Sequence, residues 1–269
     1  MINLLQVLLY LNINCGLTMD GDLFSVKGKV VIITGGGQGI GEFLALGLSK
    51  RGAIVYCIDK KFKKSKNRDG LHDMPCDITK MDKIKRVCLE IIRSNKKIDV
   101  LINNAGITIP NNSDSYSLES WSKTLDINLT GAFSFTQQVL KQMKKNRSGS
   151  IINITSLNAE FGFPNNPAYI ASKGGLKMLG KSLARDWGKY GIRVNNLGPG
   201  YILTKMTEKS YRNKKKYAVR KANTMLGRWG ETSDLLGPCI FLASDASSYI
   251  TGQDIYVDGG WTANGLPDE

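Results

Sequence analysis

Tyr169 and Lys173 lie four positions apart, and Ser156 lies thirteen positions before Tyr169. If this stretch is helical, the phenol and the ammonium share one face, a turn apart. A phenol with an ordinary pKa near ~10 exchanges protons poorly at neutral pH, and a neighbouring ammonium favours the phenolate and lowers that pKa. This spacing is more often a half-buried ring beside a solvated charge, so its meaning depends on the rest of the chain.

A glycine-rich turn follows the first strongly apolar segment. Residues 30–33 are β-branched throughout, as expected for a strand buried on both faces. The turn would bring backbone N–H groups close to a pyrophosphate at the start of a helix over 40–51. A strand over 53–58 then leads to Asp59, whose carboxylate can accept hydrogen bonds from ribose hydroxyls. The glycines of this turn are Gly35, Gly39 and Gly41.

Strands and helices alternate along the rest of the chain, which implies a parallel sheet with right-handed crossovers. Amphipathic periodicity predicts a helix over 82–95. The 269 residues contain no internal repeat and no linker, so we expect a single α/β domain with a Rossmann-type doubly wound parallel sheet. The other expected strands are 98–102, 150–155, 192–197 and 254–258, and the other expected helices are 118–145, 168–187 and 232–243.

Two segments depart from this regular pattern. Residues 1–19 are apolar at first, but they are too short to span a bilayer and carry neither a basic start nor a cleavage site. We expect a non-core extension ahead of a domain at 20–269, a cytoplasmic location and no membrane association. Residues 60–75 contain no apolar stripe, and we expect a shortened crossover that is mostly loop.

The thiols and imidazoles of the chain offer little chemistry. The five cysteines form no C-x-x-C pair and no metal-ligand spacing, so reduced, buried thiols are expected. His72 is the only histidine, which argues against a histidine-based triad and against a metal centre.

Together with further motifs, these features resemble the short-chain dehydrogenase/reductase family over nearly the whole chain, from about residue 29 to 261. Within that family the chain resembles sugar-acid members of the gluconate 5-dehydrogenase kind and 3-oxoacyl-carrier-protein reductases. The motifs are the segment 34–41, Cys76-Asp77-Ile78, Asn103-Asn104-Ala105-Gly106, Asn128, Ser156, Tyr169, Lys173, and Pro199-Gly200 followed by Thr204.

The resemblance implies a catalytic role for each of four residues. Tyr169 would be the acid/base that gives or takes the proton of the substrate hydroxyl. Lys173 would lower the pKa of Tyr169 and bind the nicotinamide ribose, and Ser156 would hydrogen-bond the substrate carbonyl oxygen. Asn128 would hold a helix distortion and a water that relays protons to Lys173. Hydride chemistry would belong to the nicotinamide cofactor.

The resemblance also implies the cofactor contacts. Asp77 would meet the adenine amino group, and Ile40 would pack below the glycine turn. The full expected set is Gly35, Gln38, Gly39, Ile40, Gly41, Asp59, Asp77, Ile78, Asn104, Ala105, Gly106, Tyr169, Lys173, Pro199, Gly200, Ile202 and Thr204, of which Pro199, Ile202 and Thr204 would hold the carboxamide.

The choice between NAD and NADP depends on opposing charges. Asp59 would repel a 2′-phosphate and so favours NAD. Lys60, Lys61 and the basic stretch after them favour NADP, while Gln38 adds no cation to the turn. We expect NAD to be preferred, because a direct carboxylate contact should outweigh flexible, screened lysines.

The net charge of +14 comes from 37 basic and 23 acidic residues and is unevenly distributed. Six basic residues lie in 60–68 and eight in 205–221, where the family places a mobile substrate lid. The second cluster could attract an anionic substrate, or it could simply be a solvated loop. Nucleic-acid binding is disfavoured because aromatic residues are not interleaved with the charges. The basic residues of the second cluster are Lys205, Lys209, Arg212, Lys214, Lys215, Lys216, Arg220 and Lys221.

Three functions remain open. The first is an NAD(P)-dependent dehydrogenase or reductase of a polar small molecule, a sugar or sugar acid, because 256–261 resembles sugar-acid members and Asn158 and Glu160 could bind hydroxyls. The second is an NADPH-dependent 3-oxoacyl-carrier-protein reductase. The third is a non-catalytic dinucleotide-binding regulator, which would not need the complete catalytic set. The resemblance further suggests a homotetramer that packs through helices near 118–145 and 168–187.

Overall fold

Seven parallel strands form the central sheet of the computed structural model, which describes residues 22–62 and 70–264. The strand order is β3-β2-β1-β4-β5-β6-β7, so the chain direction across the sheet reverses beside β1. Ligands of doubly wound sheets bind at such a reversal, beyond the carboxyl ends of the strands. The strands are β1 Val30–Thr34, β2 Ile54–Asp59, β3 Leu71–Pro75, β4 Val100–Asn103, β5 Gly149–Ile154, β6 Ile192–Pro199 and β7 Asp254–Val257.

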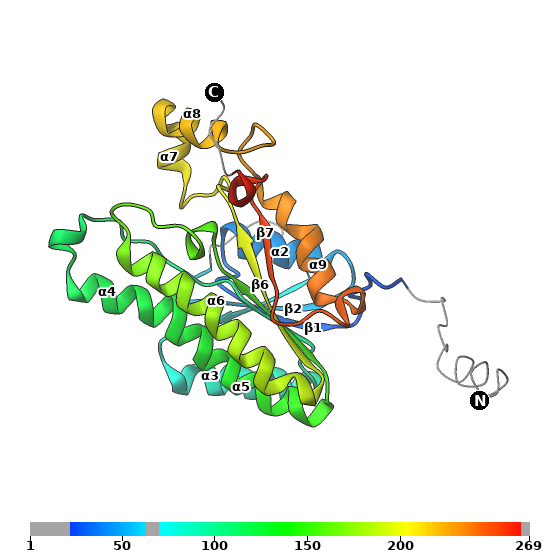
Figure 1. Ribbon diagram of the computed structural model, residues 1–269. Coiled ribbons are helices and arrows are strands. Elements are labelled where there is room, and N and C mark those ends of the chain that lie inside the picture. The colour runs from blue at the N-terminus through cyan, green and yellow to red at the C-terminus, as the bar shows by residue number, and fades with distance from the viewer. Residues whose placement is uncertain (1–21, 63–69, 265–269) are drawn as a thin grey trace, which may run out of the picture.

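Helices cover both faces of the sheet in one domain (Figure 1). Alternate residues of β1 explain why that strand is apolar throughout. Val30 and Ile32 belong to the core under α3, α5 and α6, whereas Val31 and Ile33 belong to the core under α2 and α9. The helices are α2 Gly39–Ser49, α3 Met81–Asn95, α4 Leu118–Leu125, α5 Gly131–Asn146, α6 Pro167–Trp187, α7 Glu208–Arg212, α8 Lys214–Ala222 and α9 Leu236–Ala243.

The doubly wound α/β architecture is confirmed. The expectation that 60–75 is mostly loop is wrong for its last five residues. Leu71–Pro75 forms the edge strand β3 and pairs in parallel with β2. The strand lacks a continuous apolar run because the sheet ends here and most of its side chains remain exposed. His72 still packs against the sheet, with its ring stacked 4.6 Å from that of Tyr56.

The helix predicted over 118–145 is interrupted. A π-helical turn at Asp126–Thr130 separates α4 from α5. Asn128 lies inside this turn and is fully buried. Its amide accepts a hydrogen bond from the Ile107 N–H at 2.8 Å and donates to the Ile107 carbonyl at 2.9 Å. The interruption therefore fastens the segment after β4 to the middle of the helix pair, as π turns at functional sites often do.

Several predicted features fall outside or at the edge of the described residues. The proposed extension at 1–19 and part of the basic stretch at 60–68 lie outside them. Within the described part of the chain, no helix is both long and apolar enough to cross a bilayer. The cysteines in that part, Cys57, Cys76, Cys88 and Cys239, are free and buried.

Candidate active site

A cavity of about 600 Å³ opens at the carboxyl ends of the strands. The glycine turn lies along one part of its wall, and Ser156, Tyr169 and Lys173 lie along another. It therefore occupies the crevice that the reversal of strand order predicts. Residues expected from sequence that line it are Gly35, Gln38, Gly39, Ile40, Asp59, Ile78, Asn104, Ala105, Gly106, Ser156, Tyr169, Lys173, Pro199, Gly200, Ile202 and Thr204.

The glycine turn is closed by backbone contacts that only glycine permits. Gly35 has a φ of +67° and its N–H donates to the Ile58 carbonyl at 2.7 Å. A Cβ on Gly41 would lie 2.3 Å from the Gly35 carbonyl oxygen, so this position cannot accept a side chain without opening the turn. Gly41 thus shapes the turn from behind and does not line the cavity.

Gly39 provides the test of whether this turn can receive a phosphate. It lines the cavity with a φ of +60°, and a Cβ built there would meet no protein atom within 4 Å. A side chain would consequently occupy the space in front of the turn, next to the first turn of α2. The residues present fit a dinucleotide whose pyrophosphate approaches the amino end of this helix.

Asp59 is held in place at the end of β2. One carboxylate oxygen accepts the Gly37 N–H at 3.1 Å, and the other accepts the Lys60 N–H at 2.7 Å. Lys60 also lines the cavity, and its ammonium pairs with Asp77 at 3.0 Å. Although burial opposes the change, hydrogen bonds from Thr79 and Lys60 lower the pKa of Asp77 to about 2. Asp77 does not line the cavity, because its carboxylate is turned toward Lys60 and Thr79.

The predicted catalytic side chains come together from two elements. Ser156 follows β5, while Tyr169 and Lys173 lie one turn apart on α6. The Ser156 hydroxyl lies near enough to the Tyr169 phenol to lower its pKa, and its Oγ accepts the Asn158 N–H at 3.1 Å. Lys173 is buried, and its ammonium donates to the Ile154 carbonyl at 2.7 Å. The arrangement leaves a phenol and a serine hydroxyl side by side on the cavity wall.

The expected lowering of the Tyr169 pKa by Lys173 is not found. Burial raises the pKa of Tyr169, and the hydrogen bond with Ser156 only partly opposes this. Burial also lowers the pKa of Lys173, to about 8. The ammonium lies 5.8 Å from the centre of the Tyr169 ring and is directed to the β5 carbonyl, which explains why desolvation dominates both groups.

Asn128 lies behind Tyr169 and Lys173 and does not line the cavity. Its Nδ2 donates to the Ser172 hydroxyl at 3.0 Å, and that hydroxyl donates to the Tyr169 carbonyl at 2.7 Å. The amide thereby links the π turn to the helix turn that carries Tyr169 and Lys173. The helix distortion expected at this position is confirmed.

Glu160 does not have the hydroxyl-binding position expected of it. Its carboxylate forms an ion pair with Lys177 and accepts a hydrogen bond from the Tyr256 hydroxyl. Neither Glu160 nor Asn158 lines the cavity. Glu160 instead ties the segment after Ser156 to α6 and to β7.

Several cavity residues had no clear sequence signal. Lys123 and Ile127 could have been predicted from their position next to Asn128. They lie four positions apart on the same helical stretch and therefore share a face. The others depend on the path of loops in space. The lining residues outside the expected catalytic and cofactor-binding sets are Ile58, Lys60, Cys76, Ile107, Lys123, Ile127, Ile154, Thr155, Lys205, Met206 and Thr207.

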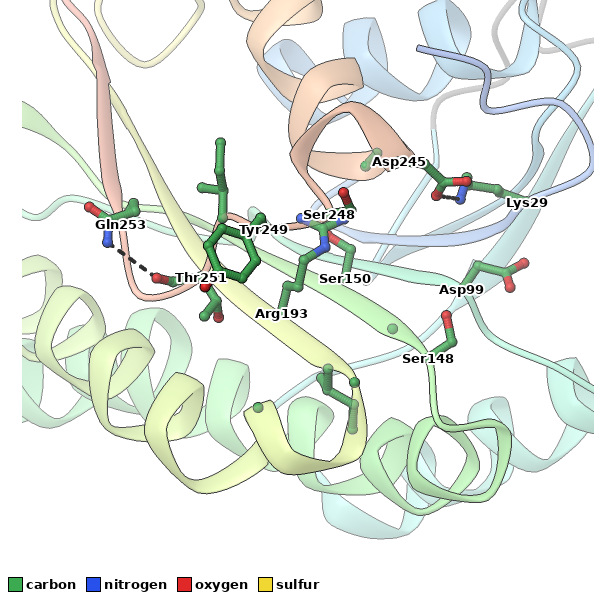
Figure 2. Close-up of a pocket in the computed structure, with 16 residues that line it drawn as sticks. Lys29, Asp99, Ser148, Ser150, Arg193, Asp245, Ser248, Tyr249, Thr251 and Gln253 are labelled. Carbon is green, nitrogen blue, oxygen red and sulfur yellow. Dashed lines mark hydrogen bonds and ion pairs between the residues drawn. The ribbon is translucent and has the colours of Figure 1, made fainter. Parts of the chain in front are cut away.

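A second cavity, of about 730 Å³, lies at the amino ends of the strands, opposite the first cavity (Figure 2). Arg193 is its most buried cation, but its guanidinium donates to the Leu242 and Ser244 carbonyls at 3.0 and 3.1 Å and so caps the end of α9. Lys29 pairs with Asp245 at 2.9 Å. These charges form ion pairs and hydrogen bonds within the protein, and Ser156, Tyr169 and Lys173 lie at the other end of the strands. Among the described residues, no cluster of three or more metal-ligating side chains occurs here or elsewhere.

Comparison with known proteins agrees with this geometry. A family model described as enoyl-(acyl carrier protein) reductase matches residues 35–262. Gluconate 5-dehydrogenase of Gluconobacter oxydans is 35% identical over 251 residues, covering 90% of this chain and 98% of that protein. A 3-oxoacyl-acyl-carrier-protein reductase of Thermotoga maritima is 37% identical over 243 residues, covering 87% of this chain and 98% of that protein.

Solved structures share the fold as well. A gluconate 5-dehydrogenase from Burkholderia cenocepacia, crystallised in complex with NADP and tartrate, superposes with a TM-score of 0.84 at 33% identity. The match covers 90% of this chain and 98% of that one. The similarity therefore extends over most of this chain and nearly all of that one.

Proposed function

The chain belongs to the short-chain dehydrogenase/reductase family of NAD(P)-dependent oxidoreductases that act on CH–OH groups, and on that premise we propose that it interconverts a sugar acid and its keto form. The observation that carries this proposal is the meeting of Ser156, Tyr169 and Lys173 on the wall of the cavity that also contains the glycine turn. A substrate hydroxyl in this cavity would contact an acid/base and a nicotinamide together.

Each catalytic residue has a role that its position supports. Tyr169 exchanges the proton of the substrate hydroxyl, and Ser156 donates to the substrate oxygen as negative charge develops there. Lys173 supplies positive charge on the same helix face and can donate to a ribose hydroxyl. Asn128 holds the helix turn that carries Tyr169 and Lys173. The nicotinamide, when bound, supplies or accepts the hydride.

The sugar-acid substrate is supported by relatives and by charge. Relatives of similar identity are named 2-dehydro-3-deoxy-D-gluconate 5-dehydrogenase of Bacillus subtilis and 5-keto-D-gluconate 5-reductase of Escherichia coli. Lys123 and Lys205 line the cavity, and Asp59, its only acidic lining residue among those described, lies at the adenosine end. A cavity with these charges suits an anionic substrate.

NAD is the proposed cofactor of preference. Asp59 is fixed by two backbone N–H groups at the carboxyl end of β2, where a carboxylate favours free ribose hydroxyls over a 2′-phosphate. Lys60 favours NADP, but its ammonium is already paired with Asp77. Three similar solved structures are described with NADP bound, so both dinucleotides must be measured.

A 3-oxoacyl-carrier-protein reductase is the second candidate. The 37% identity to the Thermotoga maritima reductase favours it, and the basic lid surface at 205–221 could receive an acidic carrier protein. NADPH preference together with turnover of acetoacetyl thioesters would support this candidate.

We also propose a cytoplasmic homotetramer. Leu118 on α4 and Met178 on α6 are large apolar side chains with 82% and 61% of their surface exposed, as expected if these helices pack against a second copy. Light scattering on the purified protein tests the assembly. Removal of residues 1–19 tests whether they are a non-core extension, in which case folding and turnover persist.

The function is tested by titrating NADH and NADPH and then assaying gluconate, 5-keto-gluconate, neutral polyols and acetoacetyl thioesters with each cofactor. Turnover of a sugar acid supports the proposal. Turnover of thioesters alone selects the second candidate. Tight cofactor binding without turnover of any of these compounds would contradict the sugar-acid assignment.

A further inference from the structure

The segment between β6 and α9 carries a cluster of aromatic side chains. This segment, 205–226, is called the lid here; its helices α7 and α8 project beyond the carboxyl ends of the strands (Figure 1). Tyr211 of α7 and Tyr217 of α8 both pack on Trp229, with ring centres 5.3 and 6.1 Å away. Trp229 is only 5% exposed, so the lid helices are fastened to a buried ring.

One of the eight lid cations differs from the others. Arg220 is the only one that is not fully exposed, because its guanidinium packs over the Tyr201 ring at 4.1 Å and the Trp229 ring at 5.4 Å. Such stacking fixes a cation in position, and the in-plane N–H groups that do not bond Tyr201 remain available. Within the described part of the chain, no carboxylate forms an ion pair with Arg220. The exposed lid cations are Lys205, Lys209, Arg212, Lys214, Lys215, Lys216 and Lys221.

Tyr201 connects this guanidinium with the active site. It lies between Gly200 and Ile202, which line the catalytic cavity, and a negative charge on its phenol would raise the pKa of Tyr169. Burial raises the pKa of Tyr201, while Arg220 opposes this through its charge and a hydrogen bond. The Tyr201 ring also lies 6.3 Å from that of Phe163, in the segment after Ser156. Arg220 does not itself line the cavity, but it is held against Tyr201, whose two chain neighbours do.

We propose that Arg220 binds the carboxylate of the acidic substrate, whereas the exposed lid cations that lie outside the cavity lining, all of them except Lys205, contribute only long-range attraction. This inference rests on the proposed sugar-acid function and specifies its recognition residue. A guanidinium can bind a carboxylate through two parallel hydrogen bonds, and pre-positioning by Tyr201 and Trp229 reduces the entropy lost on binding. Asp258 lies beside Gly200, and its carboxylate already accepts the Gly260 and Thr262 N–H groups at 2.9 and 2.8 Å.

The experiment compares R220Q and R220K with K221Q, a neighbouring exposed cation on the same helix. For each variant, kcat and KM are measured for gluconate, and a neutral polyol of equal length is measured as substrate or competitive inhibitor. We expect R220Q to raise the KM for gluconate about tenfold to a hundredfold, with kcat nearly unchanged and neutral-polyol binding unaffected. R220K should fall between wild type and R220Q. K221Q should change KM by less than about twofold, and high salt should abolish that change.

The outcomes separate this inference from the function on which it rests. Wild-type enzyme that turns over no sugar acid overturns both. Wild-type enzyme that oxidises gluconate, with R220Q having an unchanged KM, overturns only the assignment of Arg220. Equal losses of R220Q on the acid and on the neutral compound would likewise overturn it, because they would show that Arg220 only holds the lid. Cofactor dissociation constants, measured in parallel, should be the same in all variants.

Discussion

The side-chain amide of Asn196 donates a hydrogen bond of 2.7 Å to the carboxylate of Asp254 on the neighbouring strand. This bond is the last of a series that crosses four strands, since Asn103, Asn153 and Asn196 are successive partners in the sheet register. Asn103 donates to Asn153 at 2.9 Å, and Asn153 donates to Asn196 at 3.0 Å. A line of buried amides thus runs beneath α5 and α6 to the edge of the sheet.

The line of amides ends in a group of ion pairs that reaches the segment after Ser156. Asp254 pairs with Lys181 at 2.7 Å and with Lys177 at 3.7 Å, both on α6. Lys177 also pairs with Glu160, four residues after Ser156. These contacts hold the helix with Tyr169 and the segment with Ser156 to the same edge strand, so the amide line should matter for stability and for catalytic geometry.

Replacing Asn196 with alanine should destabilise the protein by about 2 kcal/mol, because it removes partners from Asn153 and Asp254 in the interior. Asn196 is only 1% exposed, which leaves water little access to those groups. Urea unfolding measures the loss. The control is Gln253→Ala, an exposed amide bonded only to the Thr251 carbonyl, which should cost less than about 0.5 kcal/mol. Equal effects of the two changes would contradict the structural role of the line.

Tyr169→Phe should reduce kcat by about a hundredfold to ten-thousandfold, because the ring is kept and only the proton-exchanging hydroxyl is lost. Cofactor affinity and thermal stability should change little. Steady-state kinetics and fluorescence titration with NADH check this. Tyr190→Phe is the matched control, since Tyr190 lies at the end of α6 among lysines and away from the cavity. A kcat within about threefold of wild type would exclude Tyr169 as the acid/base.

Alcohol oxidation should become faster as the pH rises from neutral into the alkaline range. Oxidation needs the phenolate of Tyr169, and burial raises the pKa of this phenol, so the reactive fraction grows by about tenfold per pH unit below that pKa. Ketone reduction needs the protonated phenol and should not rise over the same range, and it should fall above about pH 8, where Lys173 loses its charge. Profiles of kcat/KM against pH in both directions test this. An oxidation profile that is already flat near neutral pH would show that Lys173 lowers the Tyr169 pKa in the working enzyme.

Asp59→Asn should shift the cofactor preference toward NADP. The amide keeps the shape of the carboxylate but removes the negative charge that opposes a 2′-phosphate. We expect the ratio of kcat/KM for NAD to that for NADP to fall by about tenfold or more, a change in charge interaction of more than about 1.4 kcal/mol. Asp82→Asn, in the first turn of α3, is a control that should leave the ratio unchanged. An unchanged ratio in Asp59→Asn would mean that another group decides the preference.

Alanine at Gly41 should weaken dinucleotide binding, whereas alanine at Gly174 should stabilise the protein. At Gly41 the new Cβ would lie 2.3 Å from the Gly35 carbonyl oxygen, so the turn must open and dinucleotide affinity should fall by at least about tenfold. At Gly174, inside α6, a Cβ would meet no atom within 4 Å. Gly174→Ala should therefore stabilise the protein by up to about 1 kcal/mol through helix propensity. Dinucleotide titration and thermal unfolding of both variants provide the comparison.

Local spacing was sufficient to predict most elements of the fold. The β-branched segment before the glycine turn and the periodicity of 82–95 indicate β1 and α3 directly, because strand and helix burial repeat at fixed intervals. The edge strand β3 was missed because a repeating pattern of apolar residues arises only where side chains are buried. Its side chains are mostly exposed, so burial imposes no pattern on Leu71–Pro75.

The sequence also identified the residues that meet on the cavity wall. Tyr169 and Lys173 share a helix face through their four-residue spacing, and the glycines of the turn are required by its backbone conformation. These constraints act between residues that are close together in the chain, so they can be read directly from the sequence. Their common location follows from the parallel sheet, which brings the carboxyl ends of distant strands to one edge.

Only the tertiary structure decided the environment of these groups. Burial raises the pKa of Tyr169, and the Lys173 ammonium is directed to the Ile154 carbonyl. No spacing along the chain reports burial or the direction of an ammonium. Glu160 is bound by Lys177 and Tyr256, residues brought to it from α6 and β7. Arg220 is singled out from seven similar cations only by the rings of Tyr201 and Trp229. Composition and spacing determine which groups are available, while long-range packing determines their solvation and their partners.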